Sequence, residues 1–183
     1  DFADEARAAG AVAMLTDAEG RELAAGLGIP VLESTSPRAL LGELSAWVYR
    51  TQGADVTVFG VTGTNGKTST AYLLDAILRQ LGQRTGLSTT AERVVDGERH
   101  VSRLTTPEAP EVHGMLALMA ERGLDAITLE VSAQALTRHR VDGVVFDVAG
   151  FTNLSHDHLD DYGTMEDYLG AKAELFAPHR ARR

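Results

Sequence analysis

The sequence contains no cysteine. A disulfide framework and a thiolate metal site are therefore excluded, and the absence is compatible with the cytoplasm, where we expect the protein to work. No apolar run approaches the roughly 20 residues that a membrane-spanning helix requires, and no signal-peptide pattern opens the chain. We therefore expect no membrane partner.

An excess of positive charge is lacking as well. The chain has 17 Lys and Arg residues against 26 Asp and Glu residues, which gives a formal net charge of −9. An acidic chain is poorly suited to wrapping nucleic acid through phosphate contacts, so we expect no nucleic-acid partner. A small nucleotide can still bind, because a nest of backbone N–H groups holds phosphate whatever the net charge of the protein.

The 183 residues have an ordinary globular composition, with 44% hydrophobic and 23% charged residues. This length suggests one domain, or one domain with a piece of another. The first residue is Asp rather than Met, and the chain stops shortly after a helical pattern. We therefore expect a fragment of a longer protein.

Short apolar runs alternate with helical patterns, which predicts an α/β fold with a mostly parallel sheet and flanking helices. A polar stretch around Gly53 indicates a domain boundary. The helix expected over residues 68–81 carries apolar residues that we place on one face: Leu73, Leu74, Ile77, Leu78 and Leu81. Strands are expected over residues 11–15, 30–32, 56–61, 126–131 and 144–151, and helices over residues 17–27, 37–49, 68–81, 107–122 and 165–176.

The segment Gly60-Val-Thr-Gly-Thr-Asn-Gly-Lys-Thr68 lies between an expected strand and an expected helix. Its glycines let successive backbone N–H groups turn toward a phosphate, and the helix N-terminus adds the positive end of its dipole. Lys67 can reach the outer phosphates of a nucleotide, and the Thr68 hydroxyl can bind Mg²⁺. The strict P-loop pattern fails, because it requires Gly where the chain has Val61. An incidental glycine-rich turn is the alternative, which the Lys-Thr pair at the correct place disfavours.

The shorter segment Gly63-Thr-Asn-Gly-Lys-Thr68 resembles the form that this loop takes in the Mur ligases and in the folylpolyglutamate synthases. Three other segments narrow the resemblance to the MurE branch of the Mur ligases. They are Leu104-Thr-Thr-Pro-Glu108, Glu130-Val-Ser-Ala-Gln-Ala-Leu136, and Phe151-Thr-Asn-Leu-Ser-His-Asp-His-Leu-Asp160 followed by Tyr162-Gly-Thr-Met-Glu166. The chain resembles this branch strongly over residues 56–176 and loosely over residues 1–50.

The resemblance implies a P-loop NTPase-like domain preceded by part of a smaller α/β domain. Residues 1–54 would be the C-terminal part of the N-terminal UDP-substrate domain, and residues 55–183 an incomplete central ATP-binding domain. It also implies an ATP-dependent amide ligase of peptidoglycan precursor synthesis, with a role in cell-wall biogenesis, cell shape and cell division. Such an enzyme adds meso-diaminopimelate or L-lysine to UDP-N-acetylmuramoyl-L-alanyl-D-glutamate through an acyl phosphate. The pocket that selects the amino acid would lie in a further C-terminal domain.

The cofactors that the resemblance implies are ATP and Mg²⁺. The nucleotide would be held by the loop, the start of the next helix and one residue after a later strand: Gly63, Thr64, Asn65, Gly66, Lys67, Thr68, Ser69 and Asn153. The metal ligands would be Thr68, Glu130, His158 and Lys172, and the catalytic residues Lys67, His158 and Lys172.

Glu130 and His158 also have a chemical argument. Glu130 ends an expected strand at the sheet edge where the phosphate loop begins, and a carboxylate there suits Mg²⁺. The alternative is a solvated Glu at a strand end. His158 matches the Asp-His position of the family and is a candidate ligand for a second metal, although a lone His in a loop is more often a surface residue. His156 stands where the family often has Arg, and it is left unassigned.

Lys172 interrupts the apolar stripe of the last expected helix, which consists of Met165, Tyr168, Leu169, Leu175 and Phe176. A lysine in the middle of an apolar face is costly unless its charge is removed or paired. One possibility is that its ammonium snorkels to water. The resemblance implies instead that Lys172 is carbamylated by CO₂, which gives an anion that can help to position metal. Burial would favour this reaction, because it lowers the pKa of a lysine and exposes the neutral amine.

Hydroxyl groups and arginines suit an anionic UDP-sugar peptide, since Arg can bind a carboxylate or phosphate through two N–H groups. The Thr-Thr-Pro turn can also cap the helix that follows Pro107. Ala133 and Gln134 replace the Ser and His of the family, so no contact by these two side chains is carried over. The substrate-side candidates are Thr105, Thr106, Ser132, Arg138 and Arg140.

Three alternatives to this function stay open. The first is another ligase of the superfamily, such as a folylpolyglutamate synthase, although the Thr-Thr-Pro-Glu and Asp-His-Leu-Asp segments disfavour it. The second is a GTPase switch, since Asp160-Asp-Tyr-Gly163 matches its Asp-x-x-Gly pattern, but the chain has no guanine-reading Asn-Lys-x-Asp segment. The third is a nucleotide-binding fragment that is inactive by itself.

Overall fold

The computed structural model describes residues 2–101, 104–157 and 159–183. The chain forms two compact units, Asp1–Leu40 and Leu41–Arg183. They divide inside helix α3 (Pro37–Tyr49), which matches the helix expected over residues 37–49. The expected boundary between residues 54 and 55 separates two domains of the family architecture rather than two compact units, and it stays a prediction.

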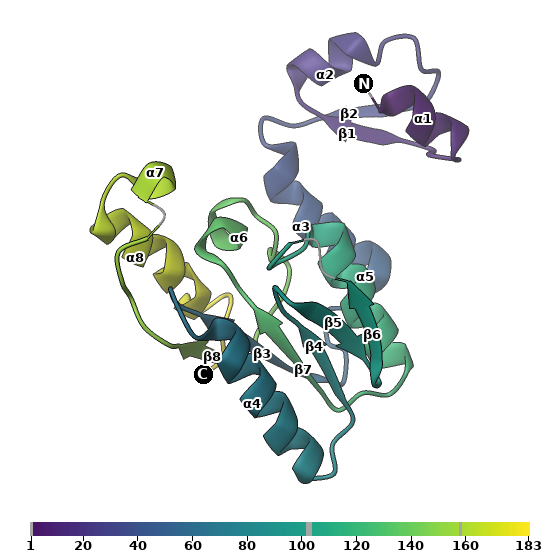
Figure 1. Ribbon diagram of the computed structural model, residues 1–183. Helices are drawn as coiled ribbons and strands as arrows, with labels where there is room; N and C mark the ends of the chain where they lie inside the picture. The colour runs from purple at the N-terminus through teal and green to yellow at the C-terminus, as the bar shows by residue number, and fades with distance from the viewer. Residues whose placement is uncertain (1, 102–103, 158) are drawn as a thin grey trace. The chain divides into compact units, whose positions relative to one another are not determined.

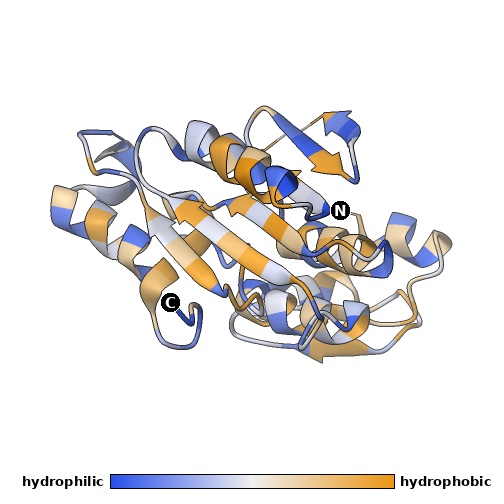
Figure 2. Ribbon diagram, turned by 90° about the horizontal axis from the view of Figure 1, so that it is seen from below, coloured by the Kyte–Doolittle hydropathy of each residue, from blue (hydrophilic) through white to orange (hydrophobic). Residues whose placement is uncertain are grey.

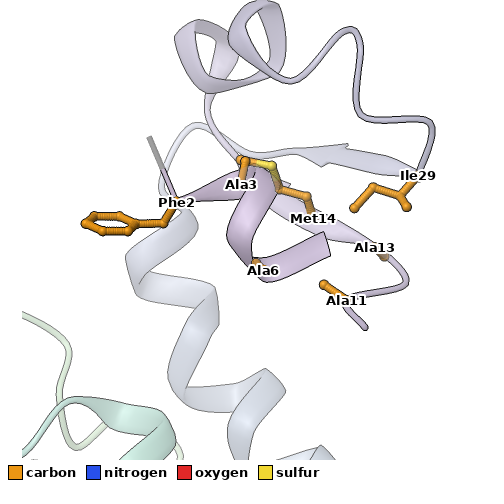
Figure 3. Close-up of a pocket in the computed structure, with 7 residues that line it drawn as sticks. All are labelled: Phe2, Ala3, Ala6, Ala11, Ala13, Met14 and Ile29. Atoms are coloured by element: carbon orange, nitrogen blue, oxygen red, sulfur yellow. The ribbon is translucent and has the colours of Figure 1, made fainter. Parts of the chain in front are cut away.

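The first unit consists of short helices and two short parallel strands. In chain order these are α1 (Ala3–Ala8), β1 (Met14–Thr16), α2 (Ala18–Leu23) and β2 (Val31–Glu33). Asp17 caps α2, because its carboxylate accepts a 2.8 Å hydrogen bond from the Gly20 N–H. Alanines and larger apolar side chains line a hollow of about 350 Å³ in this unit (Figure 3): Phe2, Ala3, Ala6, Ala11, Ala13, Met14 and Ile29.

The second unit is built on a six-stranded sheet (Figure 1). In chain order its strands are β3 (Thr57–Thr62), β4 (Thr85–Ser88), β5 (Glu92–Val95), β6 (Glu98–Val101), β7 (Ala126–Glu130) and β8 (Val148–Phe151). Their order in space is β6-β5-β4-β7-β3-β8, in which β4, β7, β3 and β8 are parallel while β5 and β6 form an antiparallel edge. The expected mostly parallel sheet is confirmed, and the antiparallel edge is an addition to it.

Helices follow most of the parallel strands of the second unit. They are α4 (Lys67–Gln80), α5 (Ala109–Glu121), α6 (Ala133–Thr137), α7 (Leu159–Tyr162) and α8 (Met165–Ala173), and a 3₁₀ turn (Glu174–Phe176) continues α8. The expected helices over residues 68–81, 107–122 and 165–176 correspond to α4, α5 and α8 with its turn. Among the described helices none is long and apolar enough to cross a bilayer.

Helices α5 and α4 cover opposite faces of the sheet. Met119 of α5 packs in one core cluster with Ile127 and Leu129 of β7. Ala71 of α4 belongs to a separate cluster on the other face. Hydrophobic residues follow the central strands (Figure 2), and every residue of β7 is buried, as expected for a strand covered on both sides. Because side chains alternate along a strand, Glu130 emerges on the α4 face.

The outer side of α4 corrects one expectation. Ala71 and Leu78 are buried toward the sheet, whereas Leu73, Ile77 and Leu81 are exposed. Leu73 follows Ala71 by two positions, which turns it about 200° around the helix axis. The apolar residues of α4 therefore do not share one buried face, because the sheet selects the side that carries the small Ala71.

Candidate functional site

The candidate site lies at the carboxyl ends of two adjacent parallel strands, β3 and β7. Val61 of β3 pairs with Glu130, the last residue of β7, and the loop of residues 63–66 follows β3. Ligands of open α/β sheets bind at this edge. The expectation that the phosphate loop and Glu130 meet at the carboxyl ends of neighbouring strands is confirmed.

Two glycines shape the loop between β3 and α4. Gly66 has a φ of +81° and Gly63 a φ of +139°, a region that L side chains rarely adopt. A Cβ at Gly63 would in addition overlap the Thr152 hydroxyl. Gly66 is the N-cap of α4, so the N–H groups of Lys67, Thr68 and Ser69 in the first turn have no intrahelical partners, and the Thr70 N–H is the first to donate, to Gly66 O. A loop of this shape can direct several N–H donors at one anion.

The sequence has two lysines, and both lie at this loop. The Lys67 ammonium donates to Gly63 O at 3.0 Å and to Thr64 O at 2.9 Å. The Lys172 ammonium, from α8, donates to the same Gly63 oxygen at 2.8 Å and lies 4.2 Å from the centre of the Tyr168 ring. Two cations on one carbonyl repel each other, so an anion placed here would be stabilised by both.

Burial lowers the pKa of both amines. For Lys172, which is 1% exposed, burial lowers the pKa from 10.5 to about 8, and the charge of Asp157 opposes the fall. The pKa of Lys67 is lowered first by burial and then by the charge of Lys172, while Glu130 raises it. The Lys172 amine is held on a carbonyl below the surface, so the snorkelling alternative is wrong.

Glu130 is buried, with an exposed fraction of 1%. One carboxylate oxygen accepts a 2.9 Å hydrogen bond from the Thr68 hydroxyl, and the other accepts a hydrogen bond from the Thr90 N–H. The alternative of a solvated Glu at a strand end is therefore wrong. A carboxylate beside a hydroxyl supplies the oxygen ligands that Mg²⁺ prefers, so the residues present fit the expected metal.

Asn153 is bonded to the phosphate loop itself. Its Oδ1 accepts from the Asn65 N–H at 3.1 Å, and its Nδ2 donates to Asn65 O at 3.0 Å. The backbone O of Asn153 also accepts from the Thr64 N–H at 2.9 Å. Ser69 lies in the first turn of α4 and is exposed. The contacts of these residues with a nucleotide stay predictions.

Thr105 and Thr106 precede α5, and their hydroxyls have different partners. Thr106 has an exposed fraction of 0%, and its hydroxyl donates to Glu130 O at 2.9 Å and accepts from the Ser132 N–H at 3.1 Å. The Thr105 hydroxyl accepts a 3.0 Å hydrogen bond from the Thr90 hydroxyl. Ser132 caps α6 through its own hydroxyl. Neither threonine caps α5, so that alternative is wrong.

The two candidate arginines each have a carboxylate partner. Arg140 Nε lies 2.9 Å from Glu108 Oε1, and Arg138 Nη2 lies 3.7 Å from Asp161 Oδ1. Gln134, at the position where the family has His, donates to Asp161 as well. An anionic substrate would share or displace these carboxylates, and its contacts with both arginines stay predictions.

His158 lies outside the described residues, so its role as a metal ligand also stays a prediction. Across the described ranges, no three His, Asp or Glu side chains converge into a group that could hold a metal ion. Mg²⁺ bound by Glu130 and Thr68 would therefore take further oxygen ligands from nucleotide phosphate and water, which is usual for this ion.

Sequence interpretation missed three residues that contact the site: Thr90, Thr152 and Ser155. Thr90 follows β4, a strand that the apolar pattern does not reveal, and its N–H reaches the Glu130 carboxylate. Thr152 and Ser155 follow β8 and bond to Asn65 in the phosphate loop. Hydroxyl residues in loops are common, so their types alone carry no signal of these contacts.

Four similarities to known proteins bear on the site. The Mur ligase middle domain family matches residues 61–183. UDP-N-acetylmuramyl-tripeptide synthetase of Leifsonia xyli subsp. xyli is 61% identical over 172 residues, which cover 94% of this chain and 34% of that protein. UDP-N-acetylmuramoyl-L-alanyl-D-glutamate–2,6-diaminopimelate ligase of Streptomyces avermitilis is 48% identical over 182 residues, covering 100% of this chain and 36% of that protein.

A solved structure of a UDP-N-acetylmuramoyl-L-alanyl-D-glutamate–2,6-diaminopimelate ligase is similar in three dimensions. Its TM-score is 0.77 at 29% sequence identity, and the match covers 98% of this chain and 36% of that one. The chain thus spans about a third of the length of the relatives that it matches.

Proposed function

The chain belongs to the Mur ligase family through its middle domain, and on this premise we propose that it carries the ATP-binding, acyl-activating part of an ATP-dependent amide ligase. The ligase would add a diamino acid to UDP-N-acetylmuramoyl-L-alanyl-D-glutamate in the cytoplasm, during peptidoglycan precursor synthesis. The observation that carries the proposal is the meeting of Lys67 and Lys172 on the Gly63 carbonyl, at the start of α4 and near the buried Glu130. These charges suit a magnesium nucleotide.

ATP would bind with its phosphates over the loop and the first turn of α4. Lys67 would turn its ammonium from the Gly63 and Thr64 carbonyls to the outer phosphates, where the acceptors are charged. Mg²⁺ held by Thr68 and Glu130 would supply neutralisation of the phosphate charge. The hydrogen bonds between Asn153 and the loop support the proposal, because they hold the loop in shape before the nucleotide arrives.

The chemistry has two steps. A terminal carboxylate oxygen of the UDP-muramoyl dipeptide attacks the γ-phosphorus of ATP, the bond to the bridging oxygen breaks, and ADP leaves an acyl phosphate behind. The amine of the second substrate then attacks the acyl carbon, loses a proton and expels inorganic phosphate. Negative charge develops on the transferred group in the first step, and Lys67 with the N-terminus of α4 is placed to stabilise it.

Lys172 is proposed to be carbamylated. Its neutral amine would attack CO₂ and lose a proton, which gives an N-carboxylate anion. The lowering of its pKa to about 8 supports this step, because the neutral amine is then accessible near neutral pH. The anion would replace the repulsion between two cations with an attraction to Lys67. Two results together would contradict carbamylation: a mass spectrum in bicarbonate that shows Lys172 unmodified, and full ligase activity without CO₂.

The second substrate is proposed to be meso-diaminopimelate or L-lysine. The Streptomyces relative is named for 2,6-diaminopimelate, and the Leifsonia relative only for a tripeptide product. Residues 1–54 are proposed to be part of the UDP-substrate domain. The hollow in the first unit gives no support to this assignment, because the side chains that line it are all apolar and offer no donor to a phosphate.

The test is turnover by the ligase that contains this chain at its natural length. The UDP-muramoyl dipeptide with diaminopimelate or lysine, ATP and Mg²⁺ should yield ADP, phosphate and a tripeptide product identified by mass. A matched mixture of folate and glutamate should yield none. Glutamate addition to folate without turnover of the UDP substrate would contradict the proposal. The 183-residue chain alone is expected to bind nucleotide without turnover, and measurable ligase activity of that chain would contradict this expectation.

A further inference from the structure

The loop between β3 and α4 is bonded along its length to the segment that follows β8. The Thr64 N–H donates to Asn153 O at 2.9 Å, and the Asn65 N–H donates to Asn153 Oδ1 at 3.1 Å. Each backbone N–H has a single hydrogen, so these two groups are not directed at a phosphate while the bonds persist. The backbone donors left for an anion are the N–H groups from Gly66 to Ser69, because the Thr70 N–H donates to Gly66 O.

Two hydroxyl side chains of the same segment contact Asn65 as well. Thr152 Oγ1 donates to Asn65 O at 2.7 Å, and Asn65 Nδ2 donates to Ser155 Oγ at 3.1 Å. Ser155 is held in turn by Thr64, whose hydroxyl accepts from the Ser155 N–H at 3.1 Å and donates to its carbonyl at 3.3 Å. The backbone and the side-chain amide of Asn65 therefore both have protein partners.

This arrangement gives a reason for the departure from the strict P-loop pattern. Val61, where that pattern requires Gly, stays inside β3 and pairs with Glu130. The turn therefore begins only at Gly63, whose φ is +139°. Lateral hydrogen bonds to Thr152, Asn153 and Ser155 then hold the turn from the side.

We propose that Thr152 and Ser155 are positioning residues of the phosphate loop, residues 63–66. Asn65 then acts by fixing the shape of this loop rather than by touching the nucleotide. The inference rests on the proposed binding of ATP at this loop. A shaping role of Asn65 and a direct contact of Asn65 with the nucleotide predict different effects at Ser155. In the shaping role, the Ser155 hydroxyl affects nucleotide affinity through its hydrogen bond to Asn65.

Calorimetric titration of the 183-residue chain with Mg·ADP tests this dependence. Ser155→Ala should weaken binding about fivefold, the usual net effect of one hydrogen bond, and Asn65→Ala should weaken it more. The double variant should bind no more weakly than Asn65→Ala alone, because both changes remove the same contact. Ser155→Thr keeps the hydroxyl and should bind close to the parent. Ser45→Ala is the control, since its hydroxyl donates to Leu41 O within α3, away from the loop.

The same titrations can overturn the inference. Parent affinity in Ser155→Ala beside a large loss in Asn65→Ala would show that Asn65 contacts the nucleotide directly. Full additivity of the two substitutions would show the same. Thr152→Val, which removes the hydroxyl and keeps the shape, should weaken binding, whereas Thr152→Ser should restore it; equal affinities of these two variants would remove Thr152 from the proposal.

Amide hydrogen exchange without nucleotide separates this inference from the proposed function. The amides of Thr64 and Asn65 should exchange slowly in the parent, because both donate hydrogen bonds, and Ser155→Ala should accelerate exchange at Asn65. If the chain binds no nucleotide and still shows this protection, the proposed function fails and the positioning contacts stand. Fast exchange of both amides in the parent would overturn the positioning role, whatever the nucleotide does.

Discussion

Two buried polar clusters of the second unit differ in how their groups are satisfied. Around His113, Nδ1 shares a 2.7 Å hydrogen bond with the Thr51 hydroxyl, and Nε2 shares one of 2.9 Å with Asp142 O. Around Gly63, two ammonium groups converge on one carbonyl. The protein itself satisfies the first cluster, whereas the second would gain from an added anion. Completeness of hydrogen bonding thus separates a cluster that holds the fold from one that suits a ligand.

The His113 cluster has a definite protonation state. The exposed fraction of His113 is 0%, and burial lowers the pKa of its ring below the ordinary value of 6.5, so the ring is neutral near pH 7. Because a carbonyl only accepts, Nε2 carries the hydrogen that bonds to Asp142 O, and Nδ1 accepts from Thr51. The Asp142 carboxylate in turn binds Arg180 at 2.6 Å and His139 at 2.8 Å. These contacts join α5 to distant parts of the chain.

Lys67→Met would test the Gly63 cluster most severely. We expect turnover of the natural-length ligase to fall about 1000-fold, since a preorganised donor to a developing negative charge contributes on the order of 10²–10³. Stability should not fall, because the substitution removes a partly desolvated cation. Phosphate release and urea unfolding measure the two quantities, with Arg7→Met of the first unit as the charge control. Retention of most of the turnover would show that the cluster does not serve the reaction.

Lys172→Met sharpens the contrast by giving activity and stability opposite signs. Turnover should fall about 100-fold through loss of an electrostatic group. The lowering of the Lys172 pKa from 10.5 to about 8 corresponds to about 3 kcal/mol, and the lost hydrogen bond to Gly63 offsets about 1 kcal/mol. The free energy of unfolding in bicarbonate-free buffer should therefore rise by about 2 kcal/mol. A fall instead would place Lys172 with the groups that hold the fold.

His113→Ala should show the reverse pattern. It leaves the Thr51 hydroxyl and Asp142 O without this partner and opens a cavity, so we expect the free energy of unfolding to fall by about 2 kcal/mol. Nucleotide affinity per folded molecule should stay unchanged, as measured by Mg·ADP titration. The control is His100→Ala, in the exposed strand β6. Weaker nucleotide binding without a loss of stability would end the distinction between the clusters.

The parts of the fold that the sequence predicts are those with strong local patterns. Helix α3 matches its expected range because Pro37 begins it and apolar residues recur at helical spacing. Strands β4 to β6 escape such reasoning. Strand β4 contains Gly86, where a side chain would collide with Met119, and β6 is exposed throughout. Such strands form because a neighbour pairs with them rather than because of their own residues.

The same division applies to the candidate site. The phosphate loop and Glu130 could be predicted, because a motif and a strand end place them at one edge of the sheet. The apolar stripe indicates a buried position for Lys172, but the hydrogen bond of its amine to the Gly63 carbonyl could not be predicted. Thr90 and Ser155 could not either, because their contacts depend on the order of the strands in space.

The pH dependence of stability that His113 contributes gives the smallest expected effect and the finest test of the contrast. Because the folded-state pKa of His113 is lowered, the unfolded chain binds more protons below pH 6.5. The contribution of the neutral ring is therefore complete above pH 6.5 and is lost as the pH falls toward the folded-state pKa, with a slope of at most about 1.4 kcal/mol per unit. Urea unfolding between pH 7 and 5, compared between the parent and His113→Ala, measures this slope, which should be smaller in the variant.

The contribution of Lys172 to stability also increases with pH, but over a pH range that does not overlap with that of His113. Its folded-state pKa of about 8 lies below the ordinary 10.5, so stability should rise with pH between these two values, and the rise should be smaller in Lys172→Met, where Lys67 still contributes through its own lowered pKa. Burial would therefore give two separate rises of stability with pH, each reduced by one substitution. If the acidic slope survives in His113→Ala, another group takes up the proton, and the His113 cluster loses the property that sets it apart from the cluster around Gly63.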